Sequence, residues 1–203
     1  MTFRQSGHGG RRGRRGVIVL VVLVAGAVGA AAAIPAIERV VRELTYPLRD
    51  AAIINRDARV EQLDPALVAA VIYAETKFDP RTSSAGALGL MQIEPATASF
   101  LAHLSGGTQF TIADLAHPAT NIAYGSYYLR YLLNLYAGNR TLALAAYNAG
   151  MTNVNRWVAR AHASGRSLTA ASIPFAQTRA YVAKVESATK TYRRYYANLL
   201  GPP

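Results

Sequence analysis

The chain alternates between long apolar runs and short polar connecting segments. Residues 17–34 are apolar and uncharged, and as a helix they would span about 27 Å, close to the hydrocarbon thickness of a bilayer. Residues 66–74 form a second run of nine apolar residues, which is too short to cross a membrane. Such a run between polar joints predicts a helix that is buried on nearly every side.

From residue 51 to the end of the chain, the sequence predicts a series of helices, and some of their starts are marked by particular residues. Asp64 followed by Pro65 predicts a helix start, because Asp is a favoured N-cap and proline fits the first helical position. Pro95 opens a further helix in the same way. Other helical stretches are predicted over residues 51–63, 121–136, 141–161 with a break near 148–150, and 178–200.

Two connecting segments are too rich in glycine, serine and threonine to be helical. Residues 81–89 predict a turn region with room for one small hairpin, and residues 105–120 predict a loop. The expected fold class is therefore all-α, with function concentrated in the irregular joints.

The first 45 residues predict a targeting region in front of one folded domain at 46–200. Residues 1–16 contain five arginines and no acid, which predicts a basic tail on the cytoplasmic side of a membrane. Residues 17–34 then predict a single-pass transmembrane anchor, and residues 35–45 a stalk outside the cytoplasm. The small residues at 31–33 leave open a cleaved signal segment and a secreted protein.

Composition and charge exclude several kinds of site and partner. The absence of cysteine excludes disulfides, thiolate metal sites and cysteine nucleophiles. The net charge is +11, but without the five tail arginines the rest carries 17 basic and 11 acidic residues, or +6, in no dense block. We therefore expect no nucleic-acid partner, although an acidic cell wall would suit this charge. The histidines lack ligand spacing, so we expect no metal and no cofactor.

Glu75 is the first charged residue after the apolar run 66–74. Burial raises the pKa of a carboxyl, and a raised pKa suits a general acid that works at neutral pH. On this helix alone, a solvent-exposed carboxylate or a pair with Lys77 or Arg81 explains Glu75 equally well. The motifs that follow decide between these readings.

Motifs surround Glu75 in a fixed order along the chain. They read ETKFDP at 75–80, GALGLMQ at 86–92, AAYNAG at 145–150 and QTR at 177–179. Together they resemble the lytic transglycosylase family of the soluble type, whose catalytic domain has a goose-lysozyme-like helical fold. The resemblance covers roughly residues 46–196. It departs from the family at Thr76, where serine is usual, and at Gln177, where glutamate is common.

The resemblance implies a peptidoglycan lytic transglycosylase. Such an enzyme cleaves the β-1,4 bond between N-acetylmuramic acid and N-acetylglucosamine without water and leaves 1,6-anhydro-muramoyl ends. The resemblance also implies that Glu75 acts first as the acid and then as the base. This reaction needs only one carboxyl. The expected partners are peptidoglycan strands, with the membrane contacted through residues 17–34. The implied substrate-binding residues are Thr76, Gly89, Met91, Gln92, Tyr147 and Asn148.

Two alternatives to this function stay open. A hydrolytic muramidase would need a second carboxylate to activate water, and Asp79 and Glu94 both lie near Glu75 in the sequence. Local turn and helix-start roles explain those two residues as well. A non-catalytic peptidoglycan-binding domain would need no acid at all.

Overall fold

The computed structural model describes residues 32–106 and 110–202, which belong to two units, Met1–Thr45 and Tyr46–Pro203. In the first unit, residues 32–45 are helical. The predicted membrane segment at 17–34 lies outside the described residues except for its last three positions. Within the described part of the chain, every helix is too short or too polar to traverse a bilayer.

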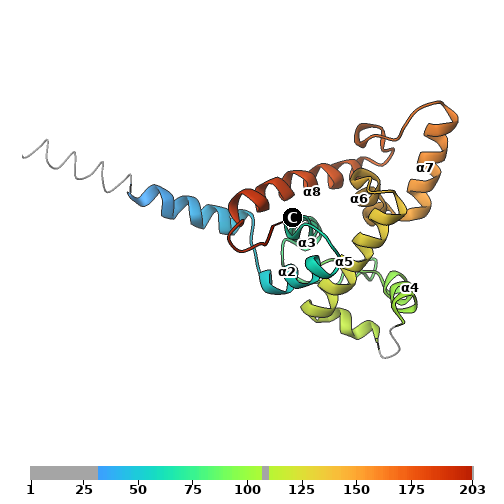
Figure 1. Ribbon diagram of the computed structural model, residues 1–203. Coiled ribbons are helices and arrows are strands. Elements are labelled where there is room, and N and C mark those ends of the chain that lie inside the picture. The colour runs from blue at the N-terminus through green and yellow to red at the C-terminus, as the bar shows by residue number, and fades with distance from the viewer. Residues whose placement is uncertain (1–31, 107–109, 203) are drawn as a thin grey trace, which may run out of the picture. The chain divides into compact units, whose positions relative to one another are not determined.

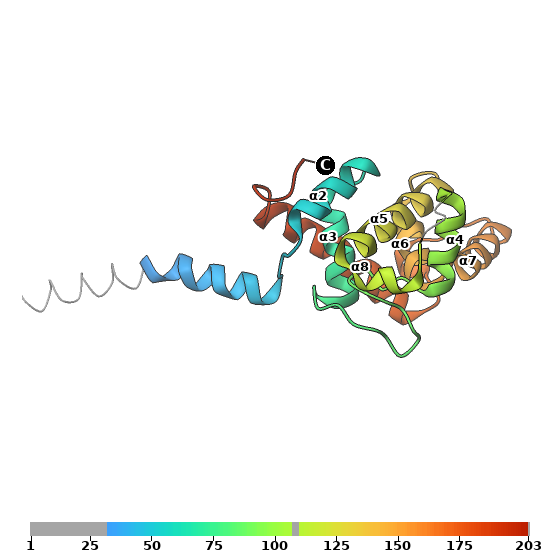
Figure 2. The same ribbon diagram turned by 90° about the horizontal axis from the view of Figure 1, so that it is seen from below.

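The second unit is built from helices, as the sequence predicts (Figures 1 and 2). Its α-helices are α2 (Ala51–Val60), α3 (Pro65–Thr76), α4 (Pro95–Ser105), α5 (Pro118–Leu135), α6 (Arg140–Ala149), α7 (Met151–Ala163) and α8 (Ala176–Tyr195). Two short 3₁₀ helices, η1 (Ile112–Ala116) and η2 (Ala170–Ser172), precede α5 and α8. The predicted loop at 105–120 is therefore partly helical, because a capping box at Thr111 and Asp114 starts η1.

Local sequence signals fix where α3 begins and ends. The Asp64 carboxylate accepts the Ala66 N–H at 2.9 Å, and Pro65 occupies the first helical position, so this predicted start is confirmed. Lys77 and Phe78 then adopt left-handed backbone angles, with φ of 54° and 64°. Two such residues in succession cannot continue a right-handed helix, so α3 ends at Thr76.

The small hairpin predicted in the first joint does not form. Leu88 and Ile93 make one isolated antiparallel bridge, with N–H to oxygen distances of 3.0 Å in both directions. Gly89 and Gln92 turn the chain between them with φ of 75° and 49°. Because Pro95 starts α4 almost at once, the residues after the turn have no room to extend into a strand. The described residues contain this bridge but no longer strand pairing.

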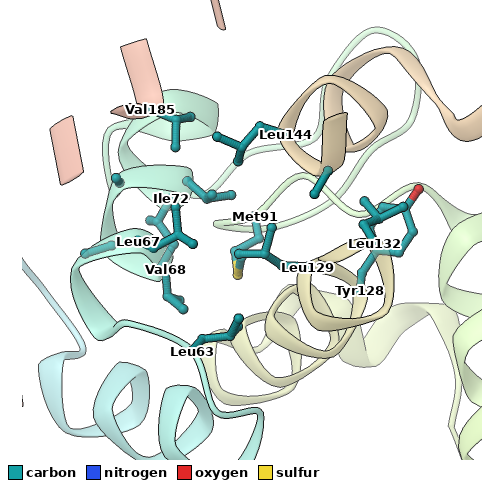
Figure 3. Close-up of a cluster of buried hydrophobic side chains, with 14 of the residues drawn as sticks. Leu63, Leu67, Val68, Ile72, Met91, Tyr128, Leu129, Leu132, Leu144 and Val185 are labelled. Carbon is teal, nitrogen blue, oxygen red and sulfur yellow. The ribbon is translucent and has the colours of Figure 1, made fainter. Parts of the chain in front are cut away.

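Helix α3 lies at the centre of the core and packs most extensively against α8. Figure 3 shows Val68 and Ile72 of α3 on one side of the buried cluster and Leu129 of α5 on the other. Met91 fills the space between these two helices, and its side chain is fully buried. The core therefore anchors the turn at 89–92 from beneath.

Gly150 separates α6 from α7, where the sequence predicts a break. Its φ of 81° and ψ of 147° are open to glycine and strained for other residues. The break places the last residues of α6 at a half-buried corner, where they line one cavity together with Glu75 of α3 and Gln92 of the turn at 89–92.

Candidate active site

A polar cleft of about 400 Å³ opens in the second unit. Its walls come from the end of α3, the loop before α4, the corner between α6 and α7, and the start of α8. The predicted site residues that line it are Glu75, Gln92, Tyr147 and Asn148. The other lining residues are Ser83, Ala85, Ala87, Ile93, Glu94, Thr97, Tyr128, Ala149, Gly150 and Gln177.

Glu75 presents its carboxyl to this cleft from the last turn of α3. Burial raises the pKa of the Glu75 carboxyl to about 7, although the Tyr181 hydroxyl and the charges of Lys184 and Arg81 act in the opposite direction. Near neutral pH both the protonated and the ionised forms of this carboxyl are therefore populated. A group with that balance can donate a proton and also accept one.

The same two cations close the C-terminal end of α3. The last carbonyl oxygens of a helix have no partners within the helix. The Lys184 Nζ donates to the Ala74 oxygen at 2.7 Å, and the Arg81 Nη2 donates to the Glu75 main-chain oxygen at 3.2 Å. Lys184 and Arg81 thus cap the helix and also favour the ionised form of the carboxyl beside them.

Tyr181 brings a buried hydroxyl to the same place. Among the described residues, no group meets hydrogen-bonding geometry with this hydroxyl, yet it lies near enough to Glu75 to lower the pKa of the carboxyl. Burial in turn raises the pKa of the Tyr181 hydroxyl well above its usual range, with the Glu75 charge adding to the effect. The phenol is therefore a neutral donor, available to a newly formed carboxylate.

Thr76 does not line the cleft. Its side chain is 1% exposed, and its hydroxyl donates to the Leu90 oxygen at 2.8 Å, with the Ile72 oxygen at 3.2 Å. This hydroxyl joins the end of α3 to the glycine-containing turn. The contact requires a hydroxyl and not serine in particular, so the departure at Thr76 keeps the link.

Gly89 and Met91 are also buried, and Asn121 of α5 holds the turn that contains them. The Asn121 Oδ1 accepts the Met91 N–H at 2.7 Å, and its Nδ2 donates to the Leu88 oxygen at 2.8 Å and the Leu115 oxygen at 3.0 Å. A Cβ atom at Gly89 would lie 2.2 Å from the Asn121 Nδ2. Glycine is therefore required here by close approach as well as by its positive φ.

Tyr147 and Asn148 reach the cleft from the end of α6. The Tyr147 hydroxyl donates to the Met91 oxygen at 2.9 Å, and its ring lies 5.2 Å from the Tyr128 ring between centroids. Burial raises the pKa of Tyr147 well above its usual range. The Asn148 Oδ1 accepts the Thr178 hydroxyl at 2.9 Å, and Asn148 lines the cleft.

Gln92 and Glu94 complete the polar wall. The Gln92 amide donates to the Arg81 oxygen at 2.7 Å and to the Gly89 oxygen at 2.8 Å, so its position is fixed. Glu94 is the only carboxylate other than Glu75 among the described residues that line the cleft, and it is exposed. Asp79 is exposed and lies outside the lining. No group of three potential metal ligands occurs in residues 32–106 and 110–202.

Sequence reasoning missed Tyr181, Lys184 and Asn121 as site residues. A signal for the first two was present, because Gln177, Tyr181 and Lys184 recur at spacings of four and three and so share one face of a helix. That face is the one α8 turns toward α3. The role of Asn121 depends on three main-chain groups from distant segments, which no local pattern reveals.

Comparisons with known proteins agree on one family. Residues 52–169 match the family model described as "Transglycosylase SLT domain". The soluble lytic murein transglycosylase of Salmonella typhimurium is 34% identical over 169 residues, which cover 78% of this chain and 24% of that protein. The Escherichia coli protein of the same name is 33% identical over 159 residues, covering 76% of this chain and 24% of the relative.

Solved structures show the same similarity. The 70-kDa soluble lytic transglycosylase from Escherichia coli superposes with a TM-score of 0.70 at 30% identity, covering 78% of this chain and 27% of that one. An inactive glutamate-to-glutamine mutant of the lytic transglycosylase Slt from Pseudomonas aeruginosa gives a TM-score of 0.69 at 30% identity, covering 79% and 26%. The chain spans about a quarter of the length of these relatives.

Proposed function

We propose, from the premise that this chain belongs to the family of proteins with a transglycosylase SLT domain, that it is a peptidoglycan lytic transglycosylase. The observation that carries the proposal is the Glu75 carboxyl in a polar cleft, with its pKa raised by burial to about 7. A reaction with one acid/base group needs a carboxyl of this kind, and it needs no second carboxylate at a fixed separation.

In the first step, protonated Glu75 donates its proton to the glycosidic oxygen between N-acetylmuramic acid and N-acetylglucosamine. The bond from C1 of the muramoyl residue to that oxygen breaks, and the N-acetylglucosamine end leaves as an alcohol. Positive charge develops at C1 as the bond breaks. Glu75 is now a carboxylate, and the charges of Lys184 and Arg81 together with the Tyr181 hydroxyl stabilise it.

In the second step, the Glu75 carboxylate removes the proton from the C6 hydroxyl of the same muramoyl residue. The C6 oxygen bonds to C1, which closes a 1,6-anhydro ring. Glu75 regains the proton that it gave up, so neither water nor a cofactor is consumed. The high pKa of the carboxyl makes this return of the proton favourable near neutral pH.

The remaining predicted site residues divide into two groups in this proposal. Gln92, Tyr147 and Asn148 line the cleft and contact the glycan. Thr76, Gly89 and Met91 are buried, and they position the turn that carries Gln92 and the carbonyl that accepts from Tyr147. Substrate contact at these three buried residues stays a prediction that their burial does not favour.

Product analysis of digested peptidoglycan tests the reaction. Wild-type protein should release muropeptides with 1,6-anhydro ends, which are lighter by one water than reducing ends and resist borohydride. Glu75→Gln should release none, whereas Glu94→Gln should retain activity because the proposed reaction needs one carboxyl. Reducing-end products that vanish in Glu94→Gln would instead establish a hydrolytic muramidase that uses both carboxyls.

For location, we propose that residues 17–34 carry the chain across the membrane and leave the Glu75 domain on the extracytoplasmic side. The support is the arginine-rich segment before this apolar run and a substrate that lies outside the cytoplasm. Protease treatment of intact spheroplasts should degrade the domain. The mass of the purified mature protein separates a retained anchor from a cleaved signal segment, and a domain protected in spheroplasts would contradict both.

A further inference from the structure

A second cavity, of about 290 Å³, lies between the end of α7 and the segment that leads to α8. Trp157 is one of its walls, and Arg160 and Arg166 stand on either side of the chain reversal that follows α7. Ser167 and Pro174 contribute to the remaining wall. None of the described residues that line this cavity carries a carboxylate.

The two arginines at this cavity, Arg160 and Arg166, are exposed. Neither forms an ion pair with another residue in the described ranges. Across residues 115–203 the sequence contains one acidic residue, Glu186, and Arg140 already pairs with it at 2.9 Å. No acid from this half of the chain is therefore left to neutralise the two arginines.

The backbone fixes where these arginines stand. Arg160 lies in the last turn of α7, and the Arg166 N–H donates to the Ala161 oxygen at 2.9 Å. Gly165 has a φ of 65°, which lets the chain reverse directly after the helix. Both side chains therefore extend from a short turn that a main-chain hydrogen bond closes, and this turn limits the distance between their Cα atoms.

The cavity is close to the cleft that contains Glu75. Pro174 lines the cavity and Gln177 lines the cleft, and three residues span at most about 11 Å between Cα atoms. By a second route, Gly150 lines the cleft and Trp157 lines the cavity, seven residues apart along α7, or about 10 Å. The two sites are therefore near enough for one polymer chain to reach from one to the other.

We propose that this cavity is a subsite for carboxylates of the peptide stems on the glycan strand that occupies the cleft. This inference rests on the proposed function, because peptidoglycan carries its stems on the muramoyl residues that Glu75 acts on. Arginine forms paired hydrogen bonds with carboxylates, and two arginines on one cavity suit a stem with more than one carboxylate. The exposed Phe175 ring packs edge-on against the buried Trp157 ring, with 4.8 Å between centroids, and offers apolar contact to the stem.

Binding measurements with the full chain carrying Glu75→Gln test the subsite without any catalysis. Fluorescently labelled glycan strands are compared in two forms, with free stem carboxylates and with those carboxylates converted to amides. Arg160→Gln/Arg166→Gln is the test variant. Arg59→Gln/Lys190→Gln is the matched control, because it removes the same charge from exposed positions outside both cavities.

The test variant should bind strands with free carboxylates about tenfold more weakly, lose no more than about twofold on amidated strands, and show a weaker salt dependence. The control should match the parent on both. An equal loss on both kinds of strand, or no loss on either, overturns the proposal. Failure of wild type to form anhydro ends would reject the proposed function alone, because this measurement involves no cleavage.

Discussion

The Tyr147 hydroxyl donates to the main-chain oxygen of Met91 at 2.9 Å, across 56 positions of the sequence. The bond ties the last turn of α6 to the buried turn that also receives the Thr76 hydroxyl at Leu90. Two walls of the cleft are thus joined by side-chain bonds to adjacent carbonyl groups. The Thr76 bond is buried and the Tyr147 bond is partly buried, so packing shields both from water.

Removal of the Tyr147 hydroxyl should therefore cost stability. In Tyr147→Phe the Met91 oxygen loses its donor at a partly buried position, so the free energy of unfolding should fall by about 1–2 kcal/mol. Urea unfolding measures the change. Tyr136→Phe is the control, because its bond to Asn155 is exposed and its loss should cost under about 0.5 kcal/mol. Equal losses in the two variants would contradict the role assigned to the Met91 bond.

Glu75→Gln should be more stable than wild type at alkaline pH. The pKa of Glu75 is raised to about 7 in the folded protein, so the native state binds more protons than the unfolded state between the two pKa values. Stability therefore falls as pH rises through this window. At pH 8 the variant should gain about 3 kcal/mol, and below pH 4 the gain should vanish.

Thermal and urea unfolding across pH 4 to 8 measure this difference. Glu94→Gln is the comparison, since it removes an exposed carboxylate from the same cleft and should show no such trend. A constant difference between wild type and Glu75→Gln at every pH would contradict a buried carboxyl with a raised pKa.

Lys184→Met should move the pH dependence of cleavage. Lys184 lowers the pKa of Glu75, so its removal raises that pKa further. The first step needs protonated Glu75, and the alkaline fall in kcat/KM should consequently shift to higher pH. Lys190→Met removes the same charge from an exposed position on α8 and should leave the profile in place. A shift to lower pH would show that Lys184 does not favour the ionised carboxyl.

Gly89→Ala should be far more harmful than Gly86→Ala. Both glycines have positive φ, 75° and 82°, so both variants bear the backbone cost of about 1 kcal/mol. At Gly89 the new Cβ would also approach the Asn121 side chain to 2.2 Å, whereas at Gly86 no atom lies within 4 Å. We expect a total loss near 2–4 kcal/mol at Gly89. Urea midpoints compare the two, and similar values would refute the close packing of Asn121.

Features encoded by neighbouring residues were predictable from the sequence. The start of α3 at Asp64-Pro65, the start of α4 at Pro95 and the break at Gly150 all depend on the backbone preferences of one or two residues. Glu75 stood out for a similar reason, since a charge directly after a long apolar run must end up at the edge of the core.

The direction in which side chains point was not predictable. Thr76 and Met91 belong to the same short motifs as Glu75 and Gln92, yet both are buried: Thr76 bonds to the Leu90 oxygen, and Met91 fills the space between α3 and α5. Lys184 reaches the Ala74 oxygen across 110 positions of sequence, a contact that exists only once α8 has docked. Sequence motifs identified the segments of the cleft, and only the packing determines which of their atoms face it.

The two cationic caps on α3 have a consequence for motion. Lys184 and Arg81 hold the final carbonyls of this helix, and the same charges set the proton affinity of Glu75. Fraying of the last helical turn would release both cations from the carboxyl at the same moment. Proton uptake at Glu75 and unwinding of its helix are therefore linked equilibria, and the exchange rate of the amide hydrogens in that turn should depend on the charge of Glu75.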